Sequence, residues 1–515
     1  MRYIKFKRLM GMSSKFYITT PIYYVNDVPH IGHAYTTLAC DIMARFKRLD
    51  DFEVFFLTGT DEHGQKVETA AKNKQLNPKD FVDEVSVNFR NLLDCMHFTN
   101  DDFIRTTEKR HFESCQKIWN KLVENGNIYL GKYSGWYAVR DEAFFLESEI
   151  VDGKAPSGAP VEWVEEPSYF FNLSKWQEKL LKYYEENKDF ICPNSRRNEV
   201  INFVKGGLKD LSVSRTSFSW GIKVPNDDKH IMYVWLDALT NYISACDYSN
   251  NENNMNDSKF WPADIHMVGK DIIRFHAVYW PAFLMAADLP LPKKVFAHGW
   301  WTNEGNKISK SLGNVINPFD LVEEYGVDQI RYFLMREVPF GNDGDFSKTQ
   351  LINRINSDLA NSYGNLFQRV VSMIFKNCNE TVPLKPTDLN KEDMVLINSL
   401  KDNINDYRNL IDNQKFDQFL KNIWLIISSA NKYIDEQAPW TLKKTNFKRM
   451  EAVLFTIIET LRQVSILLQP FMPKTTTSVL DQIKIPLNER QIKNLDNIYK
   501  GGEKIEMPQP LFPRI

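Results

Sequence analysis

The chain has 515 residues, which is too long for one compact core, so we expect two to four structural units. Its hydrophobic content of 43% and charged content of 25% are typical of globular proteins, and its net charge of −2 excludes a globally basic nucleic-acid-binding protein. The six cysteines are scattered without a CxxC pair, which favours reduced thiols, and no apolar run is long enough to cross a membrane.

The amino terminus is basic, because five lysines and arginines between Arg2 and Lys15 precede the first acidic residue, Asp27. Two interpretations stay open: a short basic tail before the first strand, or a mitochondrial presequence. We favour the tail, because transit peptides are usually longer and richer in serine and arginine. The expected location is therefore cytoplasmic, with the mitochondrial matrix as the alternative.

The next elements alternate between strand and helix. Residues 16–24 are β-branched and aromatic and predict a strand, residues 34–49 have the spacing of a helix, and residues 53–59 predict a second, buried strand. Elements in this order form a βαβ unit, which is the building block of a parallel sheet.

The middle of the chain, residues 125–231, is rich in Gly, Pro, Trp and Tyr and predicts short strands and turns inserted into the α/β core. Residues 263–269 and 293–299 then predict two further strands with a helical segment between them, so the parallel sheet resumes. From about 350 to 480 the sequence contains only amphipathic helical segments. We therefore predict an α/β protein with a Rossmann-like parallel sheet, an insertion and an all-α bundle.

The first chemical motif is His30-Ile31-Gly32-His33, placed after a strand and where the following helix should begin. A helix amino terminus offers free N–H donors and a positive dipole end, Gly32 allows a nucleotide to approach the backbone, and imidazoles can donate to phosphoryl oxygens. Alone this motif is weak evidence, because histidine pairs also serve as metal ligands or helix caps.

The second motif is Lys307-Ile308-Ser309-Lys310-Ser311, in a loop bounded by Gly and Asn residues. Lysine is a compact point charge suited to a departing pyrophosphate, and small residues let a loop close over it. By itself the motif could be a solvated basic turn. Both motifs in one α/β domain favour nucleotide chemistry.

These motifs resemble the two signatures of class I aminoacyl-tRNA synthetases, and the second departs from the usual form only by Ile308 in place of methionine. Further segments resemble the methionyl-tRNA synthetase family: TTPIYYVNDVPHIGHAY, TGTDEHGQK, YVWLDALTNY, VGKDIIRFHAVYWPAFL, AHGWWTNEGNKISKSLGN and DEQAPW. The resemblance runs in order from Phe16 to about Pro473, and this order makes it far more specific than either motif.

The resemblance implies a division of the chain and an activity. The catalytic Rossmann-like domain would occupy 1–124 and 232–300, with a connective insertion at 125–231, the KISKS loop and stem-contact region at 301–361, and a helical anticodon-binding domain at 362–515. The implied reaction is the ATP-dependent activation of L-methionine to methionyl-adenylate, followed by transfer to the 3′ end of tRNA(Met).

The resemblance also implies roles for individual residues. The implied catalytic residues are His30, His33, Lys307 and Lys310. The implied ATP site adds Gly32, Gly269, Asp271, Gly299, Trp300 and Ser309 to these four. The implied methionine contacts are Tyr24, Asp61, Trp235, Ala238, Tyr242, Phe275 and His276. The implied anticodon contacts are Asn365, Arg369 and Trp440.

Elementary chemistry agrees with several of these roles. The Asp61 carboxylate suits a substrate ammonium, although it could simply cap a helix. Aromatic rings suit a thioether sulfur, although most such residues are core residues in isolation. Amide, guanidinium and indole groups can bind splayed bases, although Arg369 and Trp440 could equally be a solvated helix face and a bundle cap.

The expected cofactor is Mg²⁺, which accompanies the substrate ATP. Many members of the family carry zinc on cysteines in the inserted region, but residues 131–145 contain no cysteine, so no structural zinc is expected. We expect a monomer, since the chain ends soon after the bundle, and no membrane contact.

Three other functions stay open. A leucyl, isoleucyl or valyl enzyme shares both signatures but normally carries a large editing insertion, for which the interval from His33 to Lys307 is too short. A nucleotidylyltransferase can share the histidine motif but does not need the helical bundle. A noncatalytic RNA-binding relative would be expected to lose the catalytic histidines or lysines, which are all present.

Overall fold

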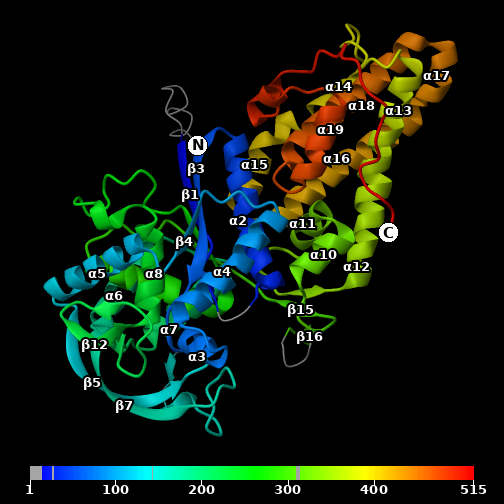
Figure 1. Cartoon of the computed structure of the whole chain (residues 1–515). Helices are drawn as coiled ribbons and strands as arrows, with labels where there is room; N and C mark the ends of the chain where they lie inside the picture. Colours follow the sequence, from blue (N-terminus) through cyan, green and yellow to red (C-terminus); the bar gives the residue numbers. More distant parts are fainter. Residues whose placement is uncertain (1–13, 26–27, 142, 146, 309–313) are drawn as a thin grey trace.

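A parallel sheet of seven strands forms the centre of the amino-terminal half of the chain (Figure 1). Along one path the strand order is β2-β3-β1-β13-β14-β8, and β4 pairs with β3. The strands are β1 (Ser14–Thr19), β2 (Tyr23–Tyr24), β3 (Phe52–Asp61), β4 (Asp102–Arg105), β8 (Ile191–Cys192), β13 (Ile265–Gly269) and β14 (Val295–His298). The computed structural model describes residues 14–25, 28–141, 143–145, 147–308 and 314–515.

Successive residues of each strand enter different apolar cores on the two faces of the sheet. Phe16 and Ile18 pack with helix α2 (Ile31–Leu49), whereas Tyr17 packs with α5 (Lys109–Glu124) and α8 (Val234–Ser244). This alternation follows from the two-residue period of a strand. Helices therefore cover both faces, as expected for a parallel sheet, and the predicted α/β class is confirmed.

The remaining helices of this half follow the strands. They are α3 (Gln65–Asn73), α4 (Pro78–Cys95) and α9 (Trp280–Ala286), which is preceded by the 3₁₀ turn η4 (Lys270–Ile272) and the π-helical turn η5 (Phe275–Tyr279). The predicted helical segment between β13 and β14 is thus broken into three pieces. π-Helical turns occur most often at functional sites, because they re-aim side chains.

The region 125–231 differs in part from the expected short strands and turns. It contains a four-stranded antiparallel sheet of β5 (Ile128–Ala138), β6 (Ala143–Phe145), β7 (Glu162–Phe171) and β9 (Leu211–Ser212), and the small strands β10 (Ser214–Arg215), β11 (Lys223–Val224) and β12 (Asp227–Met232). It also contains helices α6 (Gln177–Glu186) and α7 (Asn194–Lys205), and between them β8 returns to pair with β14 in the central sheet. The insertion therefore contributes one strand to the central sheet.

A second small sheet leads to the carboxyl-terminal half. It consists of β15 (Trp301–Asn303), β16 (Asn306–Lys307) and β17 (Gly344–Phe346), and helices α10 (Pro318–Tyr325) and α11 (Val327–Arg336) lie between β16 and β17 in the sequence. The described residues after β17 contain no further named strand.

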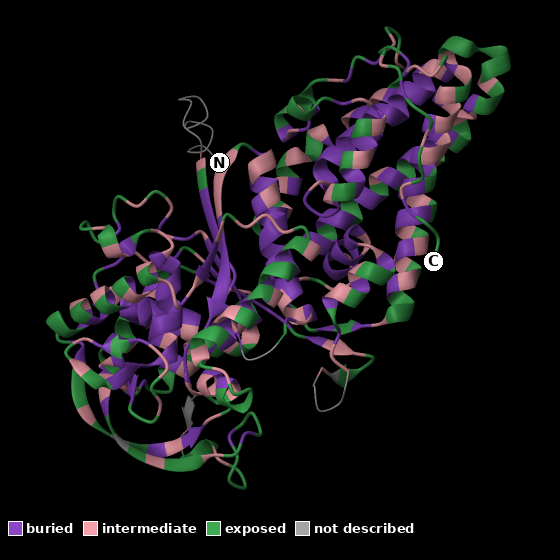
Figure 2. Cartoon of the chain, in the orientation of Figure 1, coloured by how far each residue is buried: buried purple, intermediate pink, exposed green. Residues whose placement is uncertain are grey.

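The predicted helical bundle is confirmed. Its helices are α12 (Lys348–Arg354), the π-helix η7 (Ile355–Gly364), α13 (Asn365–Asn377), α14 (Lys391–Asn398), α15 (Ile404–Asp412), α16 (Phe416–Gln437), α17 (Pro439–Thr445), α18 (Phe447–Leu468) and α19 (Pro473–Gln482), with short 3₁₀ turns at Lys401–Asn403, Leu487–Glu489 and Ile492–Asp496. Helix α18 is buried on all sides, as Figure 2 shows by its purple ribbon, which identifies it as the central helix.

The bundle and the sheet share one apolar core. The cluster that contains Phe16 and helix α2 continues through α11 and α16 into α18. At its centre the buried Arg331 guanidinium donates to Asp41 of α2 at 2.6 Å, to the carbonyl of Met96 at 2.9 Å and to that of Phe471 at 3.1 Å. The Arg331 side chain thus connects α2, whose N-cap is His30, to the bundle.

Candidate active site

Four parallel strands deliver the predicted site residues to one edge of the sheet. Strands β1, β3, β13 and β14 pair in parallel, so their carboxyl ends lie at the same edge. The predicted residues follow these ends. The segment up to His33 follows β1, Asp61 ends β3, Gly269 ends β13, and Gly299 follows β14. Ligands of open α/β sheets bind at this edge, close to the point where the strand order reverses, which here is the border of β1 and β13.

The amino terminus of α2 holds both histidines of the first motif. His30 is the N-cap residue, and its Nδ1 accepts a hydrogen bond from the Gly32 amide at 3.0 Å. The His30 amide donates in turn to Nδ1 of His33 at 3.0 Å. A nitrogen that accepts carries no proton, so in the neutral rings the proton is on Nε2 of both residues. Each ring therefore has one N–H group left to donate.

The electrostatic environment keeps both rings neutral near pH 7. Burial lowers the pKa of His30, and burial together with the neighbouring His30 ring lowers the pKa of His33 well below its ordinary value. A Cβ at Gly32 would lie 2.9 Å from Cε1 of His30, so a larger residue there would displace the His30 ring from its capping position. The motif thus forms a capped helix terminus with two neighbouring side-chain donors, a combination suited to anion binding.

Helix α8 and the π-helical turn η5 carry most of the residues that we predict to contact the substrate methionine. Trp235, Ala238 and Tyr242 lie three and four residues apart, on one face of α8. The Trp235 ring stacks on Phe275 with 3.7 Å between centroids and an interplanar angle of 5°. The Tyr242 hydroxyl lies 2.7 Å from Nε2 of His276. Of the predicted set, Trp235, Tyr242, Phe275 and His276 form one aromatic cluster, and Ala238 lies on the same face of α8.

Two further residues predicted to contact the substrate methionine, Tyr24 and Asp61, lie on β2 and β3. Tyr24 pairs with Asp61 in the parallel ladder, and the Tyr24 hydroxyl donates to the carbonyl of His63 at 2.9 Å. Asp61 is buried, with 6% of its surface exposed. A carboxylate buried at this edge is suited to a cationic ligand.

The predicted nucleotide residues around Trp300 form a connected surface. The Trp300 indole N–H donates to Oδ1 of Asp271 at 3.1 Å, and its amide donates to Oδ1 of Asp343 at 2.8 Å. Lys270 pairs with Asp343 at 2.6 Å and lies over the Trp300 ring, 4.3 Å from its centroid. Trp300 itself is 45% exposed, and an indole with this exposure suits contact with a planar ligand.

The two glycines beside Trp300 have steric explanations. A Cβ at Gly299 would lie 2.3 Å from the backbone of Asn342, and a Cβ at Gly269 would lie 2.5 Å from Oδ1 of Asp271. For Gly299, packing of the chain against itself therefore accounts for the glycine without a ligand.

Part of the second motif lies outside the described residues. Strand β16 ends at Lys307, and Ile308 packs against the shared core. Ser309 and Lys310 lie outside the described residues, and the side chain of Lys307 is not described either.

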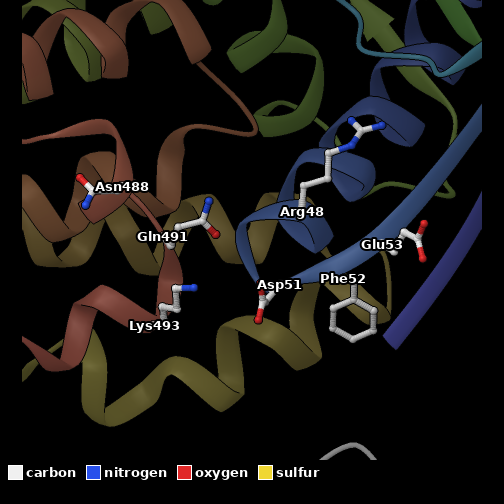
Figure 3. Close-up of a pocket in the computed structure, with 7 residues that line it drawn as sticks. All are labelled: Arg48, Asp51, Phe52, Glu53, Asn488, Gln491 and Lys493. Carbon is white, nitrogen blue, oxygen red and sulfur yellow. The ribbon is translucent and has the colours of Figure 1, made fainter. Parts of the chain in front are cut away.

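One described pocket lies away from these residues. A pocket of about 380 Å³ is lined by Arg48, Asp51, Phe52, Glu53, Asn488, Gln491 and Lys493 (Figure 3). It lies at the end of α2 and the beginning of β3, which is the amino-terminal edge of the sheet. Its mixed charges and its position away from the carboxyl edge exclude it as the site of the two histidines.

Comparison with known proteins agrees with this geometry. The family described as tRNA synthetases class I (M) matches residues 16–160 and 155–371, and the anticodon binding domain of methionyl tRNA ligase matches residues 382–515. A methionine–tRNA ligase of Rickettsia conorii is 58% identical over 508 residues, which cover 98% of this chain and 100% of that protein. The chain belongs to the methionyl-tRNA synthetase family.

Relatives in other bacteria and a solved structure extend the likeness. A methionine–tRNA ligase of Rhizobium meliloti is 54% identical over 98% of this chain and 99% of its own length. A solved methionyl-tRNA synthetase of Mycobacterium tuberculosis, in complex with methionyl-adenylate, has a TM-score of 0.93 and 46% identity, and the match covers 97% of this chain and 100% of that one.

The residues that the family resemblance assigns to the anticodon lie in the bundle, away from the sheet (Figure 1). Asn365 begins α13 and is exposed, and Arg369 follows one turn later. The Arg369 guanidinium pairs with Asp435 at 2.9 Å and lies 5.6 Å from the centroid of Trp440, which is 44% exposed. The structure therefore brings two of the three side chains into contact.

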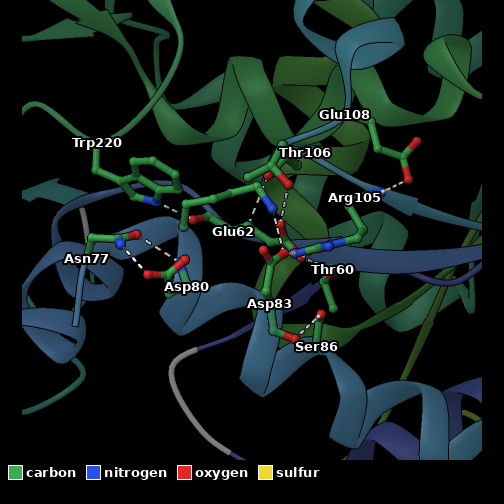
Figure 4. Close-up of polar contacts among 12 residues, drawn as sticks. Thr60, Glu62, Asn77, Asp80, Asp83, Ser86, Arg105, Thr106, Glu108 and Trp220 are labelled. Carbon is green, nitrogen blue, oxygen red and sulfur yellow. Dashed lines mark hydrogen bonds and ion pairs between the residues drawn. The ribbon is translucent and has the colours of Figure 1, made fainter. Parts of the chain in front are cut away.

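The sequence analysis missed a second set of polar residues around the turn that follows Asp61. In Figure 4 the buried Glu62 accepts from Arg105 at 2.6 Å and from Thr60 at 2.8 Å, and its amide donates to Thr106 at 2.9 Å. The Trp220 indole donates to the Glu62 carbonyl at 2.6 Å. The only available signal was a run of acidic residues inside a buried strand end.

Two general structural findings bear on cofactors and membranes. Among the described residues, His111, Cys115 and Asp237 are the group whose ligand atoms lie within 4.8 Å of one another, as a metal site would require. Nε2 of His111 is already hydrogen-bonded to Asp237 at 2.7 Å, which leaves no room for an ion between these two atoms. In the described part of the chain, no helix combines the length and apolarity that crossing a membrane needs.

Proposed function

We propose that this member of the methionyl-tRNA synthetase family activates L-methionine with MgATP and transfers the methionyl group to tRNA(Met), with the site residues in the roles described below. The observation that carries these roles is the convergence of four strand ends at one edge of the sheet. The proposed phosphate donors His30 and His33 and the buried Asp61 carboxylate follow these strand ends, and the aromatic cluster is carried by α8 and by η5, which follows β13. The likeness to a structure that contains methionyl-adenylate supports the same reading.

In the first step the methionine carboxylate attacks the α-phosphorus of ATP. A bond forms between a carboxylate oxygen and phosphorus, the bond from phosphorus to the bridging oxygen breaks, and pyrophosphate leaves. No general base is required, because the carboxylate is ionised near neutral pH. Catalysis then consists of alignment and charge stabilisation.

The His30 and His33 rings supply that stabilisation as neutral donors. Their Nε2–H groups remain available, since both Nδ1 atoms accept backbone amides. The free amides and the dipole of α2 add to the positive potential. Lys307 and Lys310 are proposed to neutralise the departing pyrophosphate, a role that rests on the motif and on the charge of lysine.

Methionine is proposed to bind between β3 and α8. Asp61 would pair with the ammonium group, which suits a buried carboxylate. Trp235 and Phe275 would contact the thioether, because polarizable sulfur packs well against aromatic rings. The adenine and ribose would lie beside Trp300, Asp271 and Gly269 at the ends of β13 and β14.

In the second step a terminal ribose hydroxyl of tRNA attacks the activated carbonyl, and AMP leaves. Asn365, Arg369 and Trp440 are proposed to contact the anticodon, with the indole stacking on a base. We also propose that the inserted sheet holds no structural zinc, since residues 131–145 contain no cysteine thiolates.

The test is methionine-dependent exchange of pyrophosphate into ATP by the purified protein. The expected result is exchange with methionine and none with leucine, isoleucine or valine. Exchange that depends on one of those three amino acids instead would overturn the proposal. Charging of tRNA(Met) transcripts, followed by release of AMP, tests the second step separately.

A further inference from the structure

A chain of buried polar side chains lies behind the aromatic cluster and takes no part in the mechanism above. Nδ1 of His63 lies 2.7 Å from Oδ2 of Asp237, and Nε2 of His111 lies 2.7 Å from Oδ1 of the same carboxylate. Nδ1 of His111 then lies 3.1 Å from the Ser244 hydroxyl. No more than 2% of any of these four residues is exposed.

This network joins elements that carry residues proposed to contact the substrate methionine. Asp237 lies on α8 between Trp235 and Ala238. His63 lies in the turn after β3, two residues beyond Asp61, and its carbonyl accepts from Tyr24. His111 lies on α5, which packs against α8. The carboxylate of Asp237 is therefore the point at which the two sides of the proposed methionine site meet.

The turn is held from the opposite side as well. Figure 4 shows Glu62 fixed by Thr60, Arg105 and Thr106, and Trp220 donating to its carbonyl. Glu62 and His63 are neighbours in the chain, so one residue anchors the turn to β4 and the other anchors it to α8. Asp61 precedes both anchors.

An ionised carboxylate in this position is unfavourable unless it is compensated. Burial would raise the pKa of Asp237, but the charge of His63 and the hydrogen bonds from His111 and His63 lower this pKa to about 2. The carboxylate therefore stays ionised and accepts from both rings at once. A neutral side chain of the same shape could not accept two such hydrogen bonds with both oxygens.

We propose that Asp237 is a positioning residue for methionine recognition, which holds the turn that carries Asp61 at a fixed distance from the aromatic face of α8. The inference rests on the proposed function, because it assumes that Asp61 binds the methionine ammonium. A residue that fixes the distance between two substrate-binding elements affects how well the substrate binds. Displacing a substrate by about 1 Å can reduce the reaction rate by roughly 10²-fold. The histidine motif at His30 has no hydrogen bond to this network among the described contacts.

The direct test is the variant Asp237→Asn in pyrophosphate exchange. Asparagine keeps the shape but places an N–H₂ group against one histidine ring. We expect the KM for methionine to rise on the order of tenfold or more, with the KM for ATP within about twofold of the wild type. The variant His63→Leu, which has no hydrogen-bond donor and so breaks the same contact from the turn, should reproduce this pattern.

Two inhibitors separate the ammonium contact from the thioether contact. Methioninol keeps the ammonium group, whereas 4-(methylthio)-1-butanol is the same molecule without it. If Asp237 positions Asp61, the inhibition constant of methioninol rises in Asp237→Asn and that of the amine-free alcohol rises much less. Equal changes for the two inhibitors would contradict the assignment.

A matched control distinguishes positioning from simple stabilisation. Glu459 is as fully buried as Asp237 and pairs with Arg462 at 2.8 Å within α18, away from the site. Glu459→Gln should lower Tm without changing the KM for methionine. If Asp237→Asn behaves in the same way, the proposal is wrong. If Asp237→Asn does not fold, His63→Leu and the two inhibitors decide. A wild-type protein without methionine-dependent exchange would instead refute the proposed function.

Discussion

The hydroxyl of Tyr242 donates a hydrogen bond to Nε2 of His276 across 2.7 Å, inside a fully buried environment. The direction follows from the other ring nitrogen, because Nδ1 lies 3.0 Å from the carbonyl of Ile272, which can only accept. Burial lowers the pKa of His276 to about 4, so the ring is neutral at pH 7 and Nε2 is unprotonated. The Tyr242 hydroxyl is therefore the donor and Nε2 of His276 the acceptor in this hydrogen bond.

Removing this hydroxyl leaves a buried acceptor without a donor. We expect Tyr242→Phe to lower the free energy of unfolding by about 1–3 kcal/mol and to raise the KM for methionine, since the ring of His276 loses its orientation. Urea denaturation and pyrophosphate exchange measure the two effects. A variant with wild-type stability and wild-type KM would show that the hydrogen bond has no role.

The histidines of the first motif give a kinetic prediction. His33→Ala removes one phosphate donor, so adenylate formation should slow by roughly 10²-fold to 10³-fold, as for other lost donors to a developing charge. It also removes the acceptor of the His30 amide at the start of α2, which costs about 1 kcal/mol. Single-turnover adenylate formation and a Tm measurement separate the two losses. An adenylation rate within about threefold of the wild type would refute the phosphate role.

Stability should depend on pH through the buried histidines. The pKa of His276 falls from 6.5 to about 4 on folding, and burial also lowers the pKa of His266 and His298. Between pH 6.5 and 4 the unfolded chain binds more protons than the folded one, so the free energy of unfolding decreases as the pH falls through this window. For His276 alone the loss amounts to about 3 kcal/mol at pH 4.

Urea denaturation at pH 7, 6 and 5 measures this slope directly. The carboxylates with lowered pKa, such as Asp237, lose their contribution only at still lower pH, and so they do not obscure it. His276→Gln should flatten the dependence. A stability that stays constant from pH 7 to 5 would contradict the neutral, buried state of these rings.

The ion pair between α2 and α11 gives a prediction about stability. Arg331 and Asp41 are fully buried, so Arg331→Met leaves the Asp41 carboxylate with Arg45 as its remaining ion-pair partner and should destabilise the protein by about 3–5 kcal/mol. The exposed pair of Lys109 and Glu113 is the control, and Lys109→Met should cost less than about 1 kcal/mol. Similar changes in the two variants would show that Arg331 contributes no more than a surface charge.

The bundle residues give a prediction about tRNA alone. Trp440→Ala should weaken charging of tRNA(Met) by about 1–3 kcal/mol of binding free energy, which is typical of one stacked base, and leave pyrophosphate exchange unchanged. Leu487→Ala, which removes another exposed apolar side chain at 78% exposure, serves as the control. Loss of exchange together with charging would mean that Trp440 supports the fold instead.

The sequence was sufficient for the main elements of the fold. The β-branched and aromatic run that begins at Phe16 and the helical spacing of residues 34–49 reflect burial within a sheet and on a helix face, and they appear as β1 and α2. The short strand β8 was not predictable, because two residues carry no period and their partner in β14 lies about 100 positions away in the chain. The π-helical turn at Phe275 was likewise invisible to a helical period.

For the site, the sequence identified the side chains that are proposed to contact substrates. It missed the buried side chains that are proposed to position them. His30 and His33 stand out because two imidazoles at a helix start are unusual. Asp237 lies in a helix whose other residues are mostly apolar, and its partners His63 and His111 come from positions 174 and 126 residues away. Only the folded chain shows that one carboxylate holds both rings.

The apolar core that runs from the sheet through α2 into α18 has a consequence for how such a protein can be divided. Phe46 of α2 meets Phe419 of α16 edge to face, with 6.0 Å between centroids. A fragment that stops before the bundle would expose this seam to water and tend to aggregate. The two halves are therefore not interchangeable parts, and an evolving or engineered chain that acquires a different bundle must also rebuild the outer face of α2.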